Sequence, residues 1–266
     1  MRVRVRVWWD SPVQRIFPTR ADLGQAELIA AYEYPDDVPW VRANMVTSLD
    51  GAAQGSNGRS GTLSSPGDKH VFAMLRALAD VILVGAGTAR KERYGPDEPR
   101  PEYAAHREAL GQRLTPPIAV VSGRLYLDPD GPLFTGPGEP TIVLTAAISP
   151  PERRAQLAER ADVVVVGDDR VDLTSALDAL TQRGHTRVLC EGGPLLLGQL
   201  VADGLLDDLC LTFAPLLRGG TADRALNGPT VPDVPMRLIH VLEDEGNLIT
   251  RWLRSTDDYP DSGIRP

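Results

Sequence analysis

Short continuous runs of Val, Ile and Leu constrain this chain more than any other feature of its sequence. They recur at 81–85, 117–122, 141–145, 162–167 and 187–191, and several hold four or five apolar residues in a row. Such runs are typical of strands that are covered on both faces. Because helical patterns lie between them, the sequence predicts a mostly parallel sheet with right-handed crossovers.

The remaining elements follow from the same reading. Further strands are expected at 41–47, 207–214, 237–243 and 247–253, and helices at 66–80, 103–112, 151–160, 172–183 and 194–203. The last two strands are joined by a turn-forming EDEGN segment, which predicts an antiparallel pair at the edge. We therefore expect an α/β fold with a mixed, mostly parallel sheet of about eight strands, helices on both faces and an antiparallel C-terminal hairpin.

The chain divides into three segments by composition and pattern. Residues 1–37 are expected to form an N-terminal extension with a helix near 20–33. Residues 38–255 carry the strand–helix alternation and form one domain, and the polar residues 256–266 form a flexible tail. No internal repeat is evident.

Composition excludes several classes of function. Thirty-six acidic and 28 basic residues give a net charge of −8, which disfavours nucleic-acid binding. The sequence has no apolar run of the ~18–20 residues that a membrane helix needs and no secretory signal pattern. Cys190 and Cys210 end apolar runs outside any CxxC pattern, so we expect buried thiols in a cytoplasmic protein. The four histidines lack metal-ligand spacing, and we expect no metal site.

Two glycine turns stand between a predicted strand and a predicted helix. Gly85, Gly87 and Thr88 lie in VILVGAGTAR, and Gly192 and Gly193 lie in VLCEGGPLLL. Glycine at such a turn lets backbone N–H groups approach an anion closely. A single turn of this kind also reflects tight packing, whereas two suggest neighbouring strand ends around one extended ligand.

The spacing argues against a Rossmann dinucleotide fingerprint. Arg90 stands where that fingerprint needs its third glycine, and no acidic residue closes a strand about 20 residues later. The next strand ends instead at Ser122-Gly123-Arg124, whose hydroxyl and guanidinium groups suit the 2′-phosphate of NADP. The alternative for Arg124 is an exposed surface arginine.

A third feature is the segment ANMVTSLDG at 43–51. Asp50 follows a strand and precedes a glycine- and serine-rich loop, so it is a candidate active-site carboxylate beneath a lid. If the 52–65 loop buries it, its pKa should rise. The alternative is a turn residue, since Asp-Gly pairs commonly mark turns.

Together these segments resemble a known family. ANMVTSLDG, SSPGDKHVFAMLRALADVILVGAGTAR, VVSGRLYLDPD, VLCEGGPLLLGQL and DDLCLTFAPLLRGG follow one pattern in order and spacing. The pattern is similar to the reductase domain of the bacterial bifunctional riboflavin-biosynthesis deaminase–reductase and to stand-alone pyrimidine reductases. The resemblance covers roughly residues 38–255. It implies a dihydrofolate reductase-like fold, NADPH as hydride donor and a homodimer.

The resemblance also implies roles for single residues. Gly85, Gly87, Thr88, Gly192 and Gly193 would hold the phosphates of the cofactor, with Ser122 and Arg124 near its 2′-phosphate. Asp50 would face the nitrogen heterocycle as the catalytic carboxylate. Ser64 and Ser65 would line the same cleft, and Glu191 would lie between cofactor and substrate.

The implied reaction is hydride transfer from NADPH to a C=N bond of a pyrimidine or pteridine, as in 5-amino-6-(5-phosphoribosylamino)uracil reduction. The chain departs from the family where an acidic-Asp-Pro segment ending in Leu-Thr-Val-Arg helps to hold the ribose phosphate, because KERYGPDEPR stands there. It also lacks the H-x-E and P-C-x-x-C motifs of a deaminase. The alternatives are a dihydrofolate or pterin reductase and a non-catalytic NADP-binding protein. A short-chain dehydrogenase is disfavoured because no Tyr-x-x-x-Lys pair is present.

Overall fold

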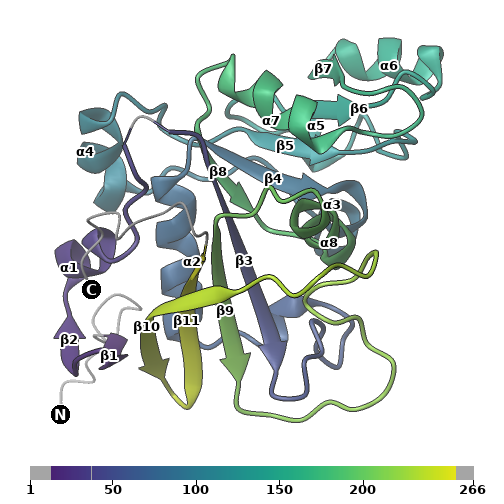
Figure 1. Cartoon of the computed structure of the whole chain (residues 1–266). Coiled ribbons are helices and arrows are strands. Elements are labelled where there is room, and N and C mark those ends of the chain that lie inside the picture. Colours follow the sequence, from purple (N-terminus) through teal and green to yellow (C-terminus); the bar gives the residue numbers. More distant parts are fainter. Residues whose placement is uncertain (1–12, 37, 256–266) are drawn as a thin grey trace, which may run out of the picture.

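One mixed sheet of eleven strands organises the protein, in the order β2-β1-β10-β11-β9-β3-β8-β4-β5-β6-β7 (Figure 1). The computed structural model describes residues 13–36 and 38–255. The strands are β1 (Val13–Phe17), β2 (Ala21–Leu23), β3 (Trp40–Ser48), β4 (Val81–Gly85), β5 (Ile118–Val121), β6 (Ile142–Thr145), β7 (Asp162–Val165), β8 (Arg187–Cys190), β9 (Asp208–Ala214), β10 (Met236–Asp244) and β11 (Asn247–Arg254). The expected fold class is confirmed, with more strands than the eight or so predicted.

The sheet is parallel on one side and antiparallel on the other. All neighbouring pairs from β9 through β3, β8, β4, β5 and β6 to β7 are parallel. The pairs β9–β11, β11–β10, β10–β1 and β1–β2 are antiparallel. The parallel strands therefore end along one edge, where crossover connections leave the sheet.

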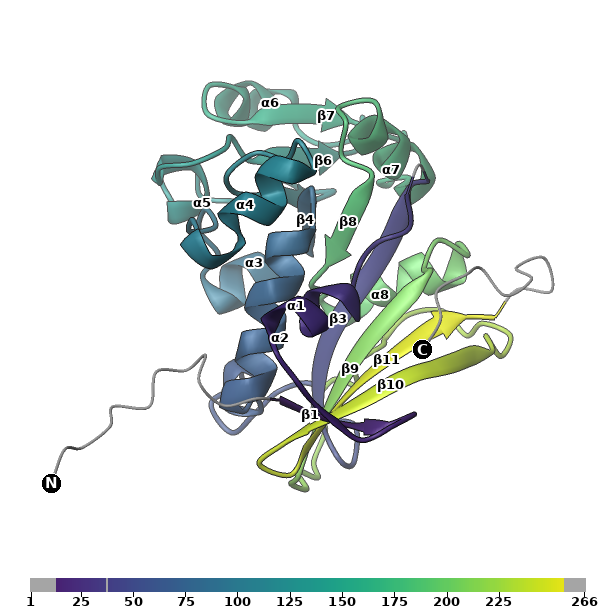
Figure 2. The same cartoon turned by 90° about the vertical axis from the view of Figure 1, so that its left-hand side faces the viewer.

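Helices cover the two faces of the parallel part unequally. They are α1 (Gln25–Ala30), α2 (Pro66–Leu78), α3 (Ala86–Glu92), α4 (Pro101–Ala109), α5 (Pro132–Thr135), α6 (Pro151–Ala158), α7 (Leu173–Thr181) and α8 (Pro194–Ala202). Two apolar clusters hold residues of α2, α3, α5 and α6 against one face, and a third holds residues of α7 and α8 against the other. Figure 2 shows α2 and α3 on one side of β4 and β8, with α8 on the opposite side.

Helix α2 begins where the sequence predicts. Ser65 is its N-cap, and the Ser65 hydroxyl accepts a hydrogen bond from the Asp68 N–H at 3.1 Å. The Asp244 carboxylate at the end of β10 accepts hydrogen bonds from the Gly67 N–H and the Ser65 hydroxyl, both at 2.7 Å. These contacts satisfy N–H groups that have no partner within the helix.

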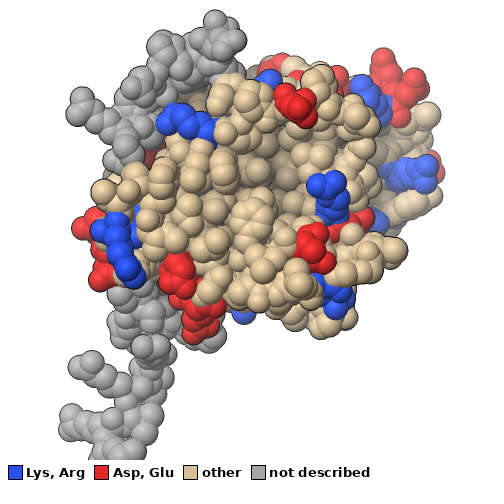
Figure 3. All heavy atoms as spheres, turned by 60° about the horizontal axis from the view of Figure 1, so that its bottom comes forward, with Lys and Arg blue, Asp and Glu red and all other residues tan. Residues whose placement is uncertain are grey.

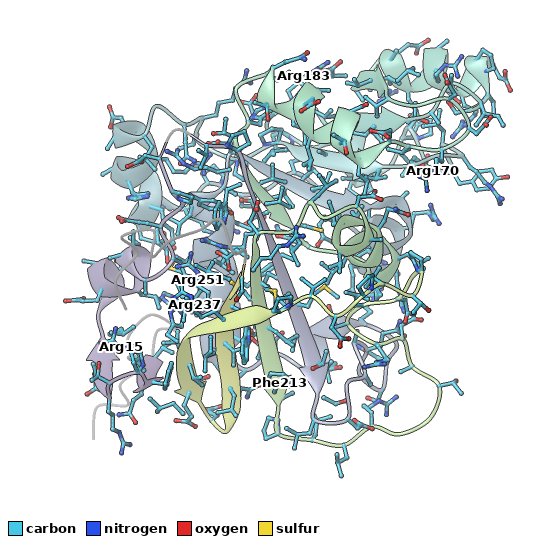
Figure 4. The ribbon with its side chains drawn as sticks, viewed as in Figure 1. Arg15, Arg170, Arg183, Phe213, Arg237 and Arg251 are labelled. Carbon is cyan, nitrogen blue, oxygen red and sulfur yellow. The ribbon has the colours of Figure 1, made fainter. Side chains whose placement is uncertain are left out.

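The segment before residue 38 joins the sheet. A helix was expected near 20–33, but α1 spans only Gln25–Ala30, and β1 and β2 precede it. Arg42, Asp208 and Arg251 form a fully buried group beneath this segment, in which both guanidiniums contact Asp208. The guanidiniums also donate to the Tyr32 and Ala31 carbonyls, which ties the segment to the sheet. Figure 4 labels Arg251 on the side of β11 that faces α1.

Among the remaining predictions, some are confirmed, some differ from the structure and some lie outside the described residues. Cys190 and Cys210 are free and buried, as predicted. Helix α3 follows the first glycine turn, where a helix was expected without stated bounds, and the short helix α5 was not expected. Residues 1–12 and the predicted tail at 256–266 lie outside the described residues. Within residues 13–36 and 38–255, no helix is long and apolar enough to cross a membrane.

Candidate functional site

The two glycine turns lie side by side, because β4 and β8 are neighbours in the sheet. The Gly85 N–H donates a hydrogen bond to the Gly192 carbonyl at 2.8 Å. A Cβ added to Gly193 would lie 2.4 Å from the Thr88 hydroxyl oxygen, so the second turn packs directly on α3. The sequence-predicted Gly85, Thr88, Gly192 and Gly193 are thus brought together, and Gly87 lies exposed at the start of α3 with open space where its Cβ would be.

Chain direction makes this junction suited to a ligand. From β4 the chain turns into α3 on one face of the sheet, and from β8 it turns into α8 on the other face. Neighbouring parallel strands whose following helices leave on opposite faces create a crevice at their carboxyl ends, where open α/β sheets bind ligands.

The two helices that start at this junction have no side-chain caps. Neither Gly85, the N-cap of α3, nor Gly193, the N-cap of α8, has a side-chain capping bond. Gly192 has φ +78°, and a Cβ there would also lie 2.9 Å from the Met45 sulfur. A larger residue at Gly192 would therefore be strained and crowded.

The predicted 2′-phosphate residues follow β5, the next strand of the sheet. Arg124 is exposed and has no hydrogen bond or ion pair to other described residues. Ser122 is buried, and its hydroxyl accepts the Leu125 N–H at 3.1 Å, so it shapes the turn. Arg90 and Tyr126, next to this turn, were not predicted from the sequence as site residues. The Arg90 guanidinium donates to the Tyr126 carbonyl, and Tyr126 is 67% exposed.

The 52–65 loop does not bury Asp50, so the condition for a raised pKa is not met. Asp50 is exposed and accepts hydrogen bonds from the Ser48 hydroxyl at 2.5 Å and from the Arg218 and Gly219 N–H groups at 3.0 and 2.6 Å. These bonds lower its pKa to about 2, with the Ser48 bond as the largest cause. A carboxyl with this pKa holds no proton near neutral pH. In the structure, the Asp50 carboxylate anchors the loop between β9 and β10.

A different carboxylate, Asp68, has the environment expected of Asp50. Asp68 lies in the first turn of α2 with 5% of its surface exposed, and its pKa is raised because burial disfavours the charged form. Hydrogen bonds from Ser64 and from the Thr212 hydroxyl, the latter at 2.6 Å, oppose that shift. Ser64 and Ser65 therefore serve the start of α2: Ser64 binds Asp68, and Ser65 caps the helix.

Helix α2 presents Asp68, Phe72 and Arg76 in a row, since residues four apart lie on one face. The Arg76 guanidinium lies 4.7 Å from the centre of the Phe72 ring. Asp68, at one end of the row, lies against β9. Arg76, at the other end, contacts Glu191, which follows β8. Since β3 separates these two strands, the ends are about 10 Å apart across the sheet.

Glu191 belongs to a buried ionic group that lies next to the Gly192 turn. Its two oxygens accept from the Arg76 Nε at 2.7 Å and from a terminal Arg76 nitrogen at 2.6 Å. The Tyr94 hydroxyl donates to the same carboxylate at 2.5 Å. The Glu191 side chain is only 2% exposed, and both of its oxygens are occupied by Arg76 and Tyr94.

Arg76 links this group to the segment after α3. It lies 3.0 Å from Asp97, which Arg100 also contacts at 2.5 Å. Together Arg76, Glu191, Asp97 and Arg100 form what we call the site cluster. The sequence did not predict this cluster, because its contacts join α2, the end of β8 and the 93–100 loop, which are distant in sequence.

The opposite face of the sheet holds an apolar cavity of about 460 Å³. Half-buried Leu209, Leu211 and Phe213 of β9 line it together with Leu197 and Val201 of α8. Because this lining has no carboxylate, the acid–base groups lie elsewhere, on the α2 face. Figure 3 views the end of the molecule where β3 and β9 stop: charged residues lie around its margin and uncharged residues form its middle, and Figure 4 labels Phe213 near the end of β9.

Comparison with known proteins shows the family of this chain. The family model of the RibD C-terminal domain matches residues 39–250. A 2,5-diamino-6-ribosylamino-4(3H)-pyrimidinone 5′-phosphate reductase of Methanothermobacter thermautotrophicus is 33% identical over 71% of this chain and 83% of its own length. The Archaeoglobus fulgidus reductase of the same name is 29% identical over 73% of this chain and 86% of its own.

Solved structures agree with the fold. A pyrimidine reductase-like protein of Corynebacterium diphtheriae is 29% identical, has a TM-score of 0.75 and covers 82% of this chain and 93% of its own. Rib7, a riboflavin biosynthesis reductase of Saccharomyces cerevisiae, is 17% identical with a TM-score of 0.60, covers 85% of this chain and 94% of its own, and shares the fold. The dihydrofolate reductase-like fold implied by the resemblance is confirmed. The chain belongs to the family of the RibD C-terminal domain.

Proposed function

We propose that this protein is an NADPH-dependent oxidoreductase that reduces a C=N bond of a pyrimidine or pteridine compound. The observation that carries the proposal is the junction of the Gly85 and Gly192 turns at the carboxyl ends of β4 and β8, with Arg76 bound to the adjoining Glu191 and Asp68 on the same face of α2. Family membership supports the reaction, since related proteins are named as riboflavin-pathway pyrimidine reductases.

The residues present fit a dinucleotide. The helix starts at Gly85 and Gly193 lack side-chain caps, so their N–H groups suit a pyrophosphate. Arg124 offers an unpaired guanidinium one strand away, where a 2′-phosphate would distinguish NADPH from NADH. When bound, the nicotinamide supplies the hydride.

The chain would orient the heterocycle and assist its protonation. A carboxylate such as Asp68 suits adjacent N–H groups of an amino-substituted ring through charge-assisted hydrogen bonds. Its raised pKa brings it closer to a group that gives or takes a proton at neutral pH. Phe72, the next residue of the same row, suits stacking on an aromatic ring.

Asp68 also favours the second candidate, reduction of a dihydropterin. A buried carboxylate can bind the amino-substituted ring edge that pterins and aminopyrimidines share, so it fits a dihydropterin as well as an aminopyrimidine. Comparing NADPH oxidation with the ribosylaminopyrimidine and with dihydrofolate separates the two candidates. If neither compound is reduced although NADPH binds, the non-catalytic alternative replaces both.

The cofactor assignment has its own test in Arg124→Ala. The variant should lose about 1.5–3 kcal/mol of binding free energy for NADPH, the usual value of a charged hydrogen bond, and little for NADH. Fluorescence titration with both cofactors measures this, and Arg170→Ala, another exposed arginine outside the crevice, is the matched control. Equal losses for both cofactors would remove Arg124 from the 2′-phosphate site.

Assembly as a homodimer, implied by the resemblance, and a cytoplasmic location, inferred from the two cysteines, belong to the same proposal. Leu195 and Leu217 expose 72% and 76% of their side chains, which supports a contact surface near α8 and the loop after β9. Light scattering across a dilution series measures the mass of the particle, and a monomer at every concentration would contradict this part.

A further inference from the structure

Two arginines converge on one carboxylate beside the candidate crevice. Asp97 accepts from Arg76 at 3.0 Å and from two nitrogens of Arg100 at 2.5 and 3.0 Å. The Asp97 side chain is 2% exposed, whereas the guanidiniums of Arg76 and Arg100 remain 14% and 21% exposed. The cations therefore lie at the surface of the site and the carboxylate lies behind them.

The positive charge of these arginines is fully matched within the protein. Arg76 also pairs with Glu191 through two nitrogens, so the site cluster contains two cations and two anions. Arginine side chains commonly bind carboxylates and phosphates in this way, with guanidinium groups directed at one anion. Here a side chain of the protein itself supplies that anion.

We infer that Asp97 is a built-in occupant of an anion subsite formed by Arg76 and Arg100, and that the heterocycle reduced by this protein carries no phosphate at that position. This rests on the proposed reductase function. The names of the related enzymes above give their substrate as a ribosylaminopyrimidine 5′-phosphate. For this protein to hold such a phosphate at the two arginines, Asp97 would have to leave them while remaining buried, which is unfavourable for an unpaired carboxylate.

The first experiment measures anion binding without catalysis. Ribose 5-phosphate is titrated calorimetrically into the wild-type protein and into Asp97→Asn, which frees Arg100 from its carboxylate while preserving side-chain shape. We expect no saturable binding by wild type and an affinity at least about tenfold higher in the variant, because one guanidinium is released for the phosphate. Asp162→Asn, which frees the surface residue Arg183, is the matched control and should gain nothing.

The arginine dependence sharpens this result. Asp97→Asn combined with Arg100→Gln should lose the gained affinity, because no freed cation remains. Saturable binding of ribose 5-phosphate to wild type, or equal affinity in wild type and Asp97→Asn, would overturn the inference. If Asp97→Asn does not fold, the titration of wild type decides alone.

The second experiment compares substrates with wild-type protein. We expect kcat/KM for the ribosylaminopyrimidine without its 5′-phosphate to exceed that for the phosphorylated form by about tenfold or more, on the same charge argument. A preference for the phosphorylated form would overturn the inference. If neither form is reduced, the ribosylaminopyrimidine candidate of the proposed function fails, and the ribose 5-phosphate titration still decides whether Asp97 fills the subsite.

Discussion

Two groups of buried arginines and carboxylates lie in this protein, and they differ in exposure. Arg42, Asp208 and Arg251, which we call the closed cluster, are 0%, 0% and 1% exposed. In the site cluster, Arg76 and Arg100 remain partly exposed. The closed cluster contacts main-chain carbonyls of the N-terminal segment, whereas the site cluster adjoins a glycine turn. The same chemistry therefore stabilises the fold at one place and lines the candidate site at the other.

The largest expected effect comes from breaking the closed cluster. Asp208→Ala leaves two guanidiniums buried without a carboxylate, so the free energy of unfolding should fall by about 3–5 kcal/mol. Urea denaturation measures the loss. The control is Asp162→Ala, which breaks an exposed pair with Arg183 and should cost no more than about 1 kcal/mol. Equal losses in the two variants would mean that burial does not distinguish these ion pairs.

Breaking the site cluster should have a smaller effect on stability and an additional effect on binding. Glu191→Gln keeps the shape of the side chain and leaves Arg76 paired with Asp97, so the expected loss is about 1.5–3 kcal/mol of unfolding free energy. Affinity for NADPH should fall as well, because Glu191 precedes Gly192. Tyr94→Phe removes one hydrogen bond from the same carboxylate and should cost about 1 kcal/mol. Unchanged NADPH affinity in Glu191→Gln would make this cluster purely structural.

The last effect depends on pH and concerns Asp207, next to Asp208. Burial raises the pKa of Asp207 from 3.8 to about 6, whereas Arg251 and Arg42 overcome burial and lower the pKa of Asp208. A raised carboxyl pKa means that the contribution of Asp207 to stability is present below 3.8 and is lost as pH rises through about 6.

Asp207→Asn removes this titration while retaining an acceptor for the Val41 N–H. Relative to wild type, the variant should therefore gain about 2 kcal/mol of unfolding free energy as pH rises from about 4 to 7. Denaturation curves at several pH values measure the gain. A difference that stays constant with pH would show that Asp207 has an ordinary pKa in the folded protein.

Sequence patterns predicted the parts of the fold that depend on local hydrophobicity. The strands ending at Gly85 and Cys190 are continuous apolar runs, and Ser65-Pro66 marks the start of α2. Strands β1 and β2 were missed because VQRIF and ADL are short and largely exposed, with no clear alternation. The bounds of helix α3 could not be predicted because AGTARKE has no apolar stripe.

The candidate site was less predictable, since its groups depend on contacts distant in sequence. Asp68 is buried against Thr212, which lies 144 residues away. Asp50 looked like an active-site carboxylate because it follows a strand and precedes a small-residue loop, yet amides of Arg218 and Gly219 hold it at the surface. One available signal was the spacing of Asp68, Phe72 and Arg76 on a predicted helix, which places three ligand-binding residue types on one face.

The most direct measurement is turnover by Asp68→Asn and Asp50→Asn, side by side, on whichever heterocycle the wild type reduces with NADPH. We expect Asp68→Asn to fold and bind NADPH but to lose on the order of 10²-fold in kcat, the usual scale of acid–base assistance. Asp50→Asn should retain most of its turnover, because asparagine can still accept the loop amides. Wild-type turnover in Asp68→Asn together with a 10²-fold loss in Asp50→Asn would contradict the account and return the catalytic carboxylate to Asp50.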